Sequence, residues 1–216
     1  MKMHKLKVML VDDHAVVRMG FKLLLQACED IEVVAEADSG EAACQIYETA
    51  TPDVVVMDIA MTGMGGIEAI KRLMARYTNA RSLALSAHED TSHPKRALQA
   101  GALGYLSKRS APEALIDAIR VVSKGQRYLD AQIAQRVAMQ GLSGHRSPLE
   151  QLSAREFEVF VQLARGQSVA QISQALKLSS STVGTHLYNI KQKLGLVNQA
   201  EMTLLAVRHG LIDVNA

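Results

Sequence analysis

Five polar side chains stand where short apolar segments end in the first half of the sequence. Asp12 and Asp13 directly follow one such segment, and Asp58 directly follows another. Ser86 ends a third segment, and Lys108 follows a fourth. An aspartate flanked by Mg²⁺, a hydroxyl and an ammonium is what phosphoryl transfer onto a carboxylate requires, because most of that catalysis is positioning and charge neutralisation. These residues therefore indicate a phosphoryl-accepting site if the fold brings them together.

The segments around these residues alternate between two hydrophobic periods. Short, mostly apolar runs typical of buried strands occupy 7–11, 31–35, 53–57, 81–85 and 103–106. Amphipathic segments of helix length follow them, at roughly 14–28, 40–50, 66–77, 92–100 and 112–124. Five strands alternating with five helices predict right-handed βαβ units and one parallel five-stranded sheet. The carboxyl ends of its strands should meet at one rim, where such sheets bind ligands.

The three aspartates should therefore converge at this rim. Carboxylates so close to one another are unfavourable unless a cation lies between them. Mg²⁺ is the ion expected, since it prefers a few carboxylates together with water and phosphate oxygens. Taken singly, Asp13 and Ser86 could cap helices, Asp58 could lie in a turn and Lys108 could be solvated. Their joint placement at four strand ends favours the functional interpretation.

Four sequence blocks at these strand ends resemble the signature blocks of two-component response-regulator receiver domains. They are Val11-Asp12-Asp13-His14, residues 57–61, residues 85–87 and residues 101–108. The resemblance covers about residues 5–125 and implies a flavodoxin-like (βα)5 fold. It also implies that Asp58 accepts a phosphoryl group from a sensor histidine kinase, and that Mg²⁺ is bound by Asp12, Asp13, Asp58 and the carbonyl of Ala60.

The resemblance gives three residues a role in the change that phosphorylation would cause in the receiver domain. Ser86 and Lys108 would bind the phosphoryl oxygens, and Tyr105 would turn inward when Ser86 shifts. An ordinary half-buried strand position is the alternative for Tyr105. The chain departs from the family pattern at Thr62, where proline is usual, and at Gly65, where aspartate is frequent. Because further glycines surround Gly65, the loop after the phosphoacceptor is expected to lose stiffness, which bears on the phosphoryl lifetime.

The composition argues against a disordered, a membrane-spanning or a secreted protein. Hydrophobic residues make up 48% and charged residues 21% of the 216 positions, which is close to the globular average and gives no sign of disorder. The apolar runs are far shorter than the roughly 20 residues that a membrane span needs. Residues 1–30 contain charged side chains and lack the uninterrupted apolar segment that a signal peptide needs. We therefore expect no membrane partner, no signal peptide and a cytoplasmic location.

The strand pattern stops after Gly125. A short helix is predicted at about 130–140, and the Gly-, Ser- and Pro-rich residues 141–148 are typical of a linker. From residue 153 onward the sequence predicts only helices, whose starts are marked by Ser153 with Glu156, Ser168 with Gln171 and Asn198 with Glu201. The predicted division is a domain at 1–125, a linker with a short helix at 126–149, and a helical domain at 150–216.

Residues 181–194 predict an amphipathic helix. Its apolar stripe comprises Val183, Leu187, Ile190 and Leu194. The polar ridge opposite and its flanks comprise Ser181, Thr185, Tyr188, Asn189, Gln192, Lys191 and Lys193. Such a ridge could read base edges in a major groove while the flanking lysines hold phosphates. An ordinary exposed helix face is the alternative, and the net charge of +2 does not decide between them.

A wider pattern around this helix resembles the LuxR-type four-helix helix-turn-helix domain over about 150–212. The matching residues are 152–156, Gly166, 169–172, 178–179, Thr182-Val183, His186 and 193–195. The resemblance implies a positioning helix at 168–178, a recognition helix at 180–195 that includes Thr182, and a pairing helix at 198–210. A receiver with this output is the NarL/FixJ class of response regulator, a transcription factor whose phosphorylation promotes homodimerisation and binding of double-stranded DNA.

Two other functions use some of the same residues. Haloacid-dehalogenase-like phosphohydrolases also employ a nucleophilic aspartate, Mg²⁺, a hydroxyl and a lysine. They place the nucleophile after the first strand in an Asp-x-Asp pattern, whereas Asp12 and Asp13 are adjacent here. A receiver that signals without phosphorylation is disfavoured by the complete acidic set. The sequence therefore predicts a phosphoacceptor that turns over no separate substrate and is not an enzyme in that sense.

Overall fold

The chain folds into two compact units, Met1–Ala138 and Met139–Ala216. The computed structural model describes residues 5–87, 92–142, 148–209 and 211–212. The first unit is α/β and the second is helical, which confirms the predicted fold class. The finer division at residues 125 and 149 stays a prediction. In the described ranges, no helix is both long and apolar enough to cross a membrane.

The first unit is built on a parallel sheet with the strand order β2-β1-β3-β4-β5-β6. The strands are β1 (Leu6–Val11), β2 (Ile31–Ala37), β3 (Val54–Asp58), β4 (Ser82–Ser86), β5 (Gly104–Ser107) and β6 (Tyr128–Leu129). The prediction of five strands was one short, because β6 pairs with the edge of β5. A two-residue strand carries no period that a sequence can reveal. Gly104 allows close packing here, since a Cβ there would lie 2.7 Å from Leu83 Cδ1 and 3.2 Å from the Tyr128 carbonyl oxygen.

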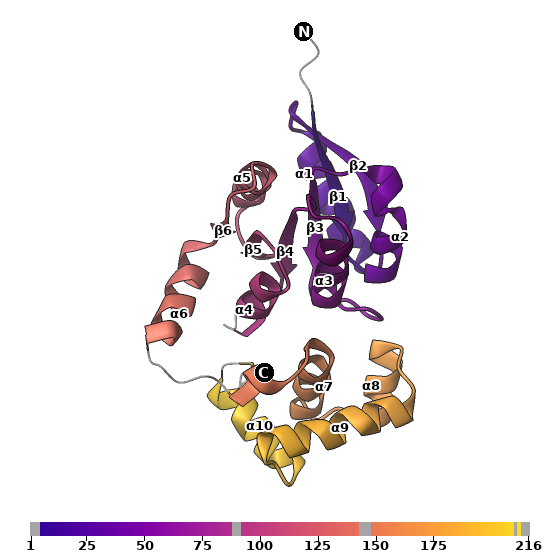
Figure 1. Ribbon diagram of the computed structural model, residues 1–216, viewed down its shortest axis with the longest axis vertical. Coiled ribbons are helices and arrows are strands. Elements are labelled where there is room, and N and C mark those ends of the chain that lie inside the picture. The colour runs from indigo at the N-terminus through magenta and orange to yellow at the C-terminus, as the bar shows by residue number, and fades with distance from the viewer. Residues whose placement is uncertain (1–4, 88–91, 143–147, 210, 213–216) are drawn as a thin grey trace. The chain divides into compact units, whose positions relative to one another are not determined.

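Helices cover both faces of the sheet (Figure 1). They are α1 (Ala15–Gln26), α2 (Gly40–Ala50), α3 (Gly66–Arg76), α4 (Ser92–Gln99) and α5 (Pro112–Ser123). On one face, α1 and α5 share a core with strand residues, to which Leu25, Leu115 and Ile119 contribute. On the other, α2 contacts α3 and α3 contacts α4. Burial on both faces explains why the strands are almost continuously apolar.

The second unit begins within α6 (Ala131–Leu142) and continues through a short 3₁₀ helix (Pro148–Gln151). Its remaining helices are α7 (Ala154–Ala164), α8 (Val169–Leu176), α9 (Ser180–Leu194) and α10 (Gln199–Arg208). Ser153 and Ser168 begin α7 and α8 with complete capping boxes, as their spacing to Glu156 and Gln171 predicted. The side chain of Asn198 caps α10 by accepting from a backbone N–H three residues on.

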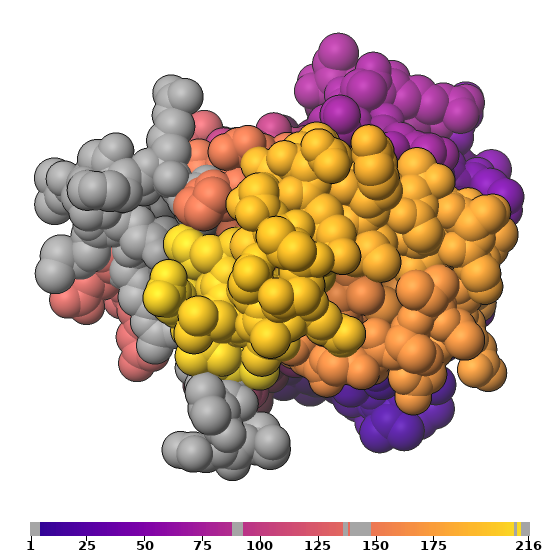
Figure 2. Space-filling model, turned by 90° about the horizontal axis from the view of Figure 1, so that it is seen from below, coloured from indigo at the N-terminus to yellow at the C-terminus, as the bar shows by residue number. Residues whose placement is uncertain are grey.

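Helices α7 to α10 enclose one apolar core. Phe157 and Phe160 of α7 belong to it, together with Ile172, Val183 and Met202 from the other three helices. Both α9 and α10 pack on α7. Their outer sides form a continuous surface, orange passing to yellow in Figure 2. The core therefore fixes which side of α9 can meet a partner.

Candidate functional site

Asp12, Asp58 and Lys108 meet at the carboxyl-end rim of the parallel sheet. Lys108 Nζ donates to Asp12 Oδ2 and to Asp58 Oδ2, both at 2.7 Å. Only 3% of Asp12 and 1% of Asp58 is exposed. Asp12 follows β1 and Lys108 follows β5, as predicted, whereas Asp58 is the last residue of β3 instead of the residue after it. The fold thus joins side chains that lie up to 96 residues apart.

Asp13 lies beside this group with one oxygen bonded and the other without a hydrogen bond. The backbone N–H of Thr62 donates to Asp13 Oδ2 at 3.0 Å. Asp13 Oδ1 is buried and accepts no hydrogen bond from the described part of the chain, although His14 Nδ1 lies 2.9 Å away. Ligand atoms of Asp12, Asp13, His14 and Asp58 all lie within 4.8 Å of one another. The sequence block at 11–14 includes His14, but sequence reasoning gave this histidine no role at the site.

This donor set fits Mg²⁺. Three carboxylates face one ammonium, so three negative charges and one positive charge leave an excess that a divalent cation would balance. The buried Oδ1 of Asp13 offers an oxygen that no hydrogen bond from the described residues occupies. Carboxylate oxygens with access for water and phosphate oxygens are the surroundings that Mg²⁺ prefers. Asp12, Asp13 and Asp58 are the side chains that would hold the ion.

Burial governs the protonation of the two central groups. It raises the pKa of Asp58 above the ordinary aspartate value, and the Lys108 ammonium only partly opposes this shift. Burial acts to lower the pKa of Lys108, but the Asp58 and Asp12 carboxylates outweigh it and raise that pKa. The raised pKa of Lys108 favours the ammonium form beside the two carboxyl groups. The Asp58 carboxyl group is thus held beside a cation, and its role as the phosphoacceptor stays a prediction.

Ser86, Tyr105 and Ala60 lie close to this group in the fold. Ser86 is the fully buried last residue of β4, and its carbonyl accepts from the Lys108 backbone N–H at 2.7 Å. Tyr105 lies opposite Ala84 in the β4–β5 ladder and is fully buried, where a half-buried position was the alternative. Ala60 is exposed, and its N–H donates to Asp58 Oδ1 at 3.0 Å. The phosphoryl-binding, switching and metal-binding roles of these residues stay predictions.

The loop after Asp58 is tied to its surroundings. The Met64 N–H donates to Glu41 Oε1 at 2.8 Å, which links the loop to α2. Gly66 packs directly on the Asp58 backbone, since a Cβ at this position would lie 2.0 Å from the Asp58 carbonyl oxygen. Glycine is therefore required at position 66 for close packing. The loss of stiffness expected from the glycines stays a prediction, but these contacts act against it.

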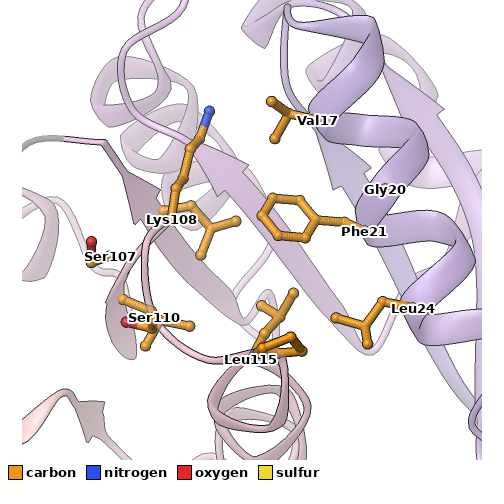
Figure 3. Close-up of a pocket in the computed structure, with 11 residues that line it drawn as sticks. Val17, Gly20, Phe21, Leu24, Ser107, Lys108, Ser110 and Leu115 are labelled. Atoms are coloured by element: carbon orange, nitrogen blue, oxygen red, sulfur yellow. The ribbon is translucent and has the colours of Figure 1, made fainter.

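An apolar pocket of about 350 Å³ opens next to Lys108, between α1 and α5 (Figure 3). Phe21 reaches into it from α1 and Leu115 from α5, while the aliphatic part of Lys108 forms another wall. Gly20 also lines the pocket, and a Cβ there would meet no neighbouring atom within 4 Å. The same helix carries three exposed apolar side chains: Val16, Met19 and Leu23. The rim is thus bordered by an apolar surface on α1.

In the second unit, α9 is oriented as its hydrophobic spacing predicted. Val183 and Ile190 are fully buried. The exposed residues of the ridge are Ser181, Thr185, Tyr188 and Gln192, while Thr182 and Asn189 are partly buried. Tyr188 is 64% exposed. The Ser179 hydroxyl that caps α9 lies 2.8 Å from the hydroxyls of Ser181 and Thr182. That these residues contact DNA stays a prediction.

Both lysines beside this ridge make bonds that the sequence did not reveal. Lys191 Nζ donates to the Val197 carbonyl oxygen at 2.8 Å. Lys193 Nζ donates to Glu156 Oε2 at 2.6 Å, and only 4% of Glu156 is exposed. Because Glu156 also completes the capping box of α7, one carboxylate joins the start of α7 to the end of α9. Lys193 therefore has a structural role in addition to the phosphate contact predicted for it.

Both units match protein families along most of their length. Residues 8–120 match the family described as "Response regulator receiver domain", and residues 150–206 match "Bacterial regulatory proteins, luxR family". The chain belongs to the response regulators. With a receiver followed by a LuxR-type helix-turn-helix, it is a DNA-binding transcriptional regulator of the NarL/FixJ class.

This response regulator is similar to curated relatives and to a solved structure. The response regulator GacA of Pseudomonas aeruginosa is 40% identical over 210 residues, which are 96% of this chain and 98% of the relative. The response regulator UvrY of Escherichia coli K12 is 40% identical over 210 residues, 96% of each chain. A LuxR-family two-component response regulator from Aurantimonas sp. SI85-9A1 has 38% identity and a TM-score of 0.62, with 64% of this chain and 99% of that chain covered.

The ion pair between Glu156 and Lys193 should make the unfolding free energy of the second unit depend on pH. Burial acts to raise the pKa of Glu156, but the bonds from Lys193 and from the Ser153 backbone lower it below its ordinary value of 4.5. A carboxyl group with a lowered pKa in the folded state stabilises the fold above its unfolded pKa. This contribution is lost as the pH falls through the folded pKa.

Glu156→Gln should isolate this contribution. Glutamine can keep the capping box, as Gln171 does in α8, but it carries no charge for Lys193. The variant should lose about 1–3 kcal/mol of unfolding free energy near neutral pH. The difference from the wild type should shrink as the pH falls below the ordinary glutamate pKa. Urea titrations at several pH values, with hydrogen exchange of α9 amides as the probe, measure it. A difference that stays constant down to acid pH would contradict the assignment.

Proposed function

We propose that this response regulator is switched by Mg²⁺-dependent transfer of a phosphoryl group from a sensor histidine kinase to Asp58. The observation that carries the proposal is the pair of 2.7 Å bonds from Lys108 to Asp58 and Asp12. A buried ion pair of this kind is weak evidence for stability, because desolvation offsets the attraction between the charges. Buried, strongly coupled charges at a ligand-binding rim favour a functional site instead.

The groups at the rim would stabilise the negative charge of the phosphoryl group during its transfer. An Asp58 oxygen forms a bond to phosphorus while the bond from phosphorus to the donor nitrogen breaks. Lys108 would exchange its bond to Asp58 Oδ2 for a bond to a phosphoryl oxygen, and the Ser86 hydroxyl would donate to another. Bound Mg²⁺ would neutralise phosphoryl charge from a site made by Asp12, Asp13, Asp58 and the Ala60 carbonyl.

Phosphorylation would reach the helical domain as a population shift between two receiver states. Ser86 and the buried Tyr105 ring are the groups expected to differ between these states. The phosphorylated state would favour homodimers that pair through the helix at 198–210 and place α9 in the major groove of double-stranded DNA. The division into 1–125, 126–149 and 150–216 and a cytoplasmic location belong to the same proposal.

Phosphorylation should raise the affinity for operator DNA by about 5- to 150-fold, the usual range for coupling between two sites. Lys108→Ala should still permit some phosphorylation but lose most of this gain, because the ammonium that binds the phosphoryl group is missing. Genome-wide DNA capture supplies the operator, and fluorescence anisotropy at fixed salt measures its affinity for both forms. Equal affinity of the phosphorylated and unphosphorylated wild type would reject the switch.

The pocket beside Lys108 supports a docking place for the kinase on α1. The donor has to bring its phosphoryl group within bonding distance of Asp58, and the apolar surface of α1 borders the rim. Gly20 lies in the middle of this surface, and no contact requires glycine there. A glycine inside a helix costs about 1 kcal/mol relative to alanine. Close approach of a helix of the kinase would account for it.

Gly20→Leu should slow phosphotransfer from the kinase by about tenfold or more, which corresponds to a loss of about 1.4 kcal/mol of docking free energy. Labelling by acetyl phosphate should be unchanged, because a small donor needs no protein surface. Gly20→Ala is the graded comparison: a Cβ alone takes up less of the space that a kinase helix would approach, so it should slow transfer less than leucine does. Rapid-quench assays with both donors test this. Equal slowing with kinase and acetyl phosphate would place the effect in the site and not in docking.

A further inference from the structure

The bond between the Thr62 amide and Asp13 connects two segments 49 residues apart in the sequence. The N–H belongs to the loop that follows β3, and it donates to Oδ2 of Asp13, the second residue of the acidic pair, at 3.0 Å. Thr62 is only partly buried, so burial alone does not force its amide to find a protein partner. The bond is therefore a specific feature of this loop.

The amide is held in place from both sides. Before it in the chain, the side chains of Ile59 and Met61 are buried in the receiver. After it, the Met64 N–H is bonded to Glu41 Oε1 on α2. The donor therefore has a fixed position before any ligand arrives, which is the condition for orienting a binding group effectively.

We propose that the Thr62 backbone amide is the positioning group that presents Asp13 to Mg²⁺, an inference that rests on the proposed function. The amide occupies Oδ2, whereas Oδ1 is buried near the ligand oxygens of Asp12 and Asp58. Oδ1 accepts no hydrogen bond from the described residues, and the His14 Nδ1 that lies 2.9 Å from it would have to give way to the ion. An oriented carboxylate does not have to be ordered when the ion binds, so its partner adds to metal affinity. Thr62 itself is not a ligand of the ion.

The backbone N–H carries this role, and two substitutions separate it from the side chain. Thr62→Ala keeps the N–H and removes the hydroxyl. Thr62→Pro removes the N–H, because proline has no amide proton. The position lies between β3 and α3, so proline there interrupts no helix or strand. The pair of variants therefore tests the hydrogen bond and not the side-chain chemistry.

Calorimetric titration of the full chain with Mg²⁺ alone, without a phosphodonor, is the decisive experiment. The wild type and Thr62→Ala should bind with the same Kd, and Thr62→Pro should bind about tenfold more weakly. Equal affinity of the wild type and Thr62→Pro would overturn the inference, as would an equal loss in both variants. Absence of Mg²⁺ binding by the wild type would overturn the proposed function instead, so the two failures are distinguishable.

Amide exchange in the ¹⁵N-labelled wild type tests the same bond if Thr62→Pro does not fold. The Thr62 amide should exchange slowly with solvent, and it should stay protected when Mg²⁺ is saturating. Asp13→Ala should make this amide exchange quickly while the Met64 amide, bonded to Glu41, stays protected. A Thr62 amide that exchanges equally fast in the wild type and in Asp13→Ala would overturn the inference. Loss of protection on Mg²⁺ binding would also overturn it, because the amide would then compete with the ion.

Discussion

Asp58→Asn should abolish phosphorylation of the response regulator. Incubation of the wild type with acetyl phosphate and Mg²⁺ should add a single phosphoryl group, whereas the variant should add none. Asparagine has nearly the same shape and can still accept the Ala60 N–H, so the fold should persist. It has no carboxylate oxygen to attack phosphorus, so the chemistry should be lost. Mass spectrometry of the intact protein distinguishes the two outcomes.

Asp53→Asn is the matched control for this experiment. Asp53 lies just before β3, at the opposite end of the strand that carries Asp58, and its Oδ2 accepts the Lys7 N–H at 2.8 Å. The same substitution on the same strand should therefore leave labelling at the wild-type level. Labelling of Asp58→Asn at that level would mean that another carboxylate of the rim, Asp12 or Asp13, accepts the group.

The rim could be predicted because periodicity alone places the ends of strands. Once apolar strands alternate with amphipathic helices, the strands must be parallel, and polar residues that follow them must lie at the same end of the sheet, its carboxyl-end rim. The boundary of β3 was wrong by one residue, and Asp58 proved to be part of the strand. It still reached the rim, because β3 ends there together with β1 and β4. Small boundary errors therefore leave this kind of site prediction intact.

Two pairings away from the strand ends could not be predicted, because no period connects their partners. A helical wheel places Lys193 on a flank of α9, but it contains no information about Glu156, which lies 37 residues earlier. The Thr62 amide was equally invisible as a partner of Asp13, since any residue except proline supplies a backbone N–H. Patterns in the sequence thus fix the elements and their faces, while pairings across elements require the fold.

Val183→Asp should have a large effect in the output domain, by unfolding it. Val183 is fully buried in the core that α9 shares with α7, α8 and α10. A carboxylate placed there without a partner costs several kcal/mol, a large fraction of the stability of a small domain. Binding to every DNA sequence should be lost together with the helical signal of this domain in circular dichroism. An intact fold with altered base preference would mean that this side of α9 faces DNA.

Substitutions on the opposite side of α9 should instead separate base reading from phosphate contact. Tyr188→Ala removes an exposed side chain of the ridge, so it should cost about 1–3 kcal/mol of binding free energy and relax the preference at particular base pairs. Lys191→Ala should weaken binding to all sequences alike and reduce the slope of log affinity against log salt by about one. Lys191 is the better test of a phosphate contact, because its own bond to the Val197 carbonyl is exposed, whereas replacing Lys193 would break its pair with the buried Glu156.

A panel of operator mutants measured at two or more salt concentrations tests this assignment. Lys124→Ala is the control for net charge, because this exposed lysine follows α5 in the receiver, far along the chain from α9. It should leave both the base preference and the salt slope unchanged. If Tyr188→Ala lowered affinity uniformly while Lys191→Ala changed the base preference, α9 would lie in the groove rotated about its axis, with the lysine side toward the base edges. The core contacts of Val183 limit that rotation, so the predicted arrangement is the one in which Tyr188 reads bases.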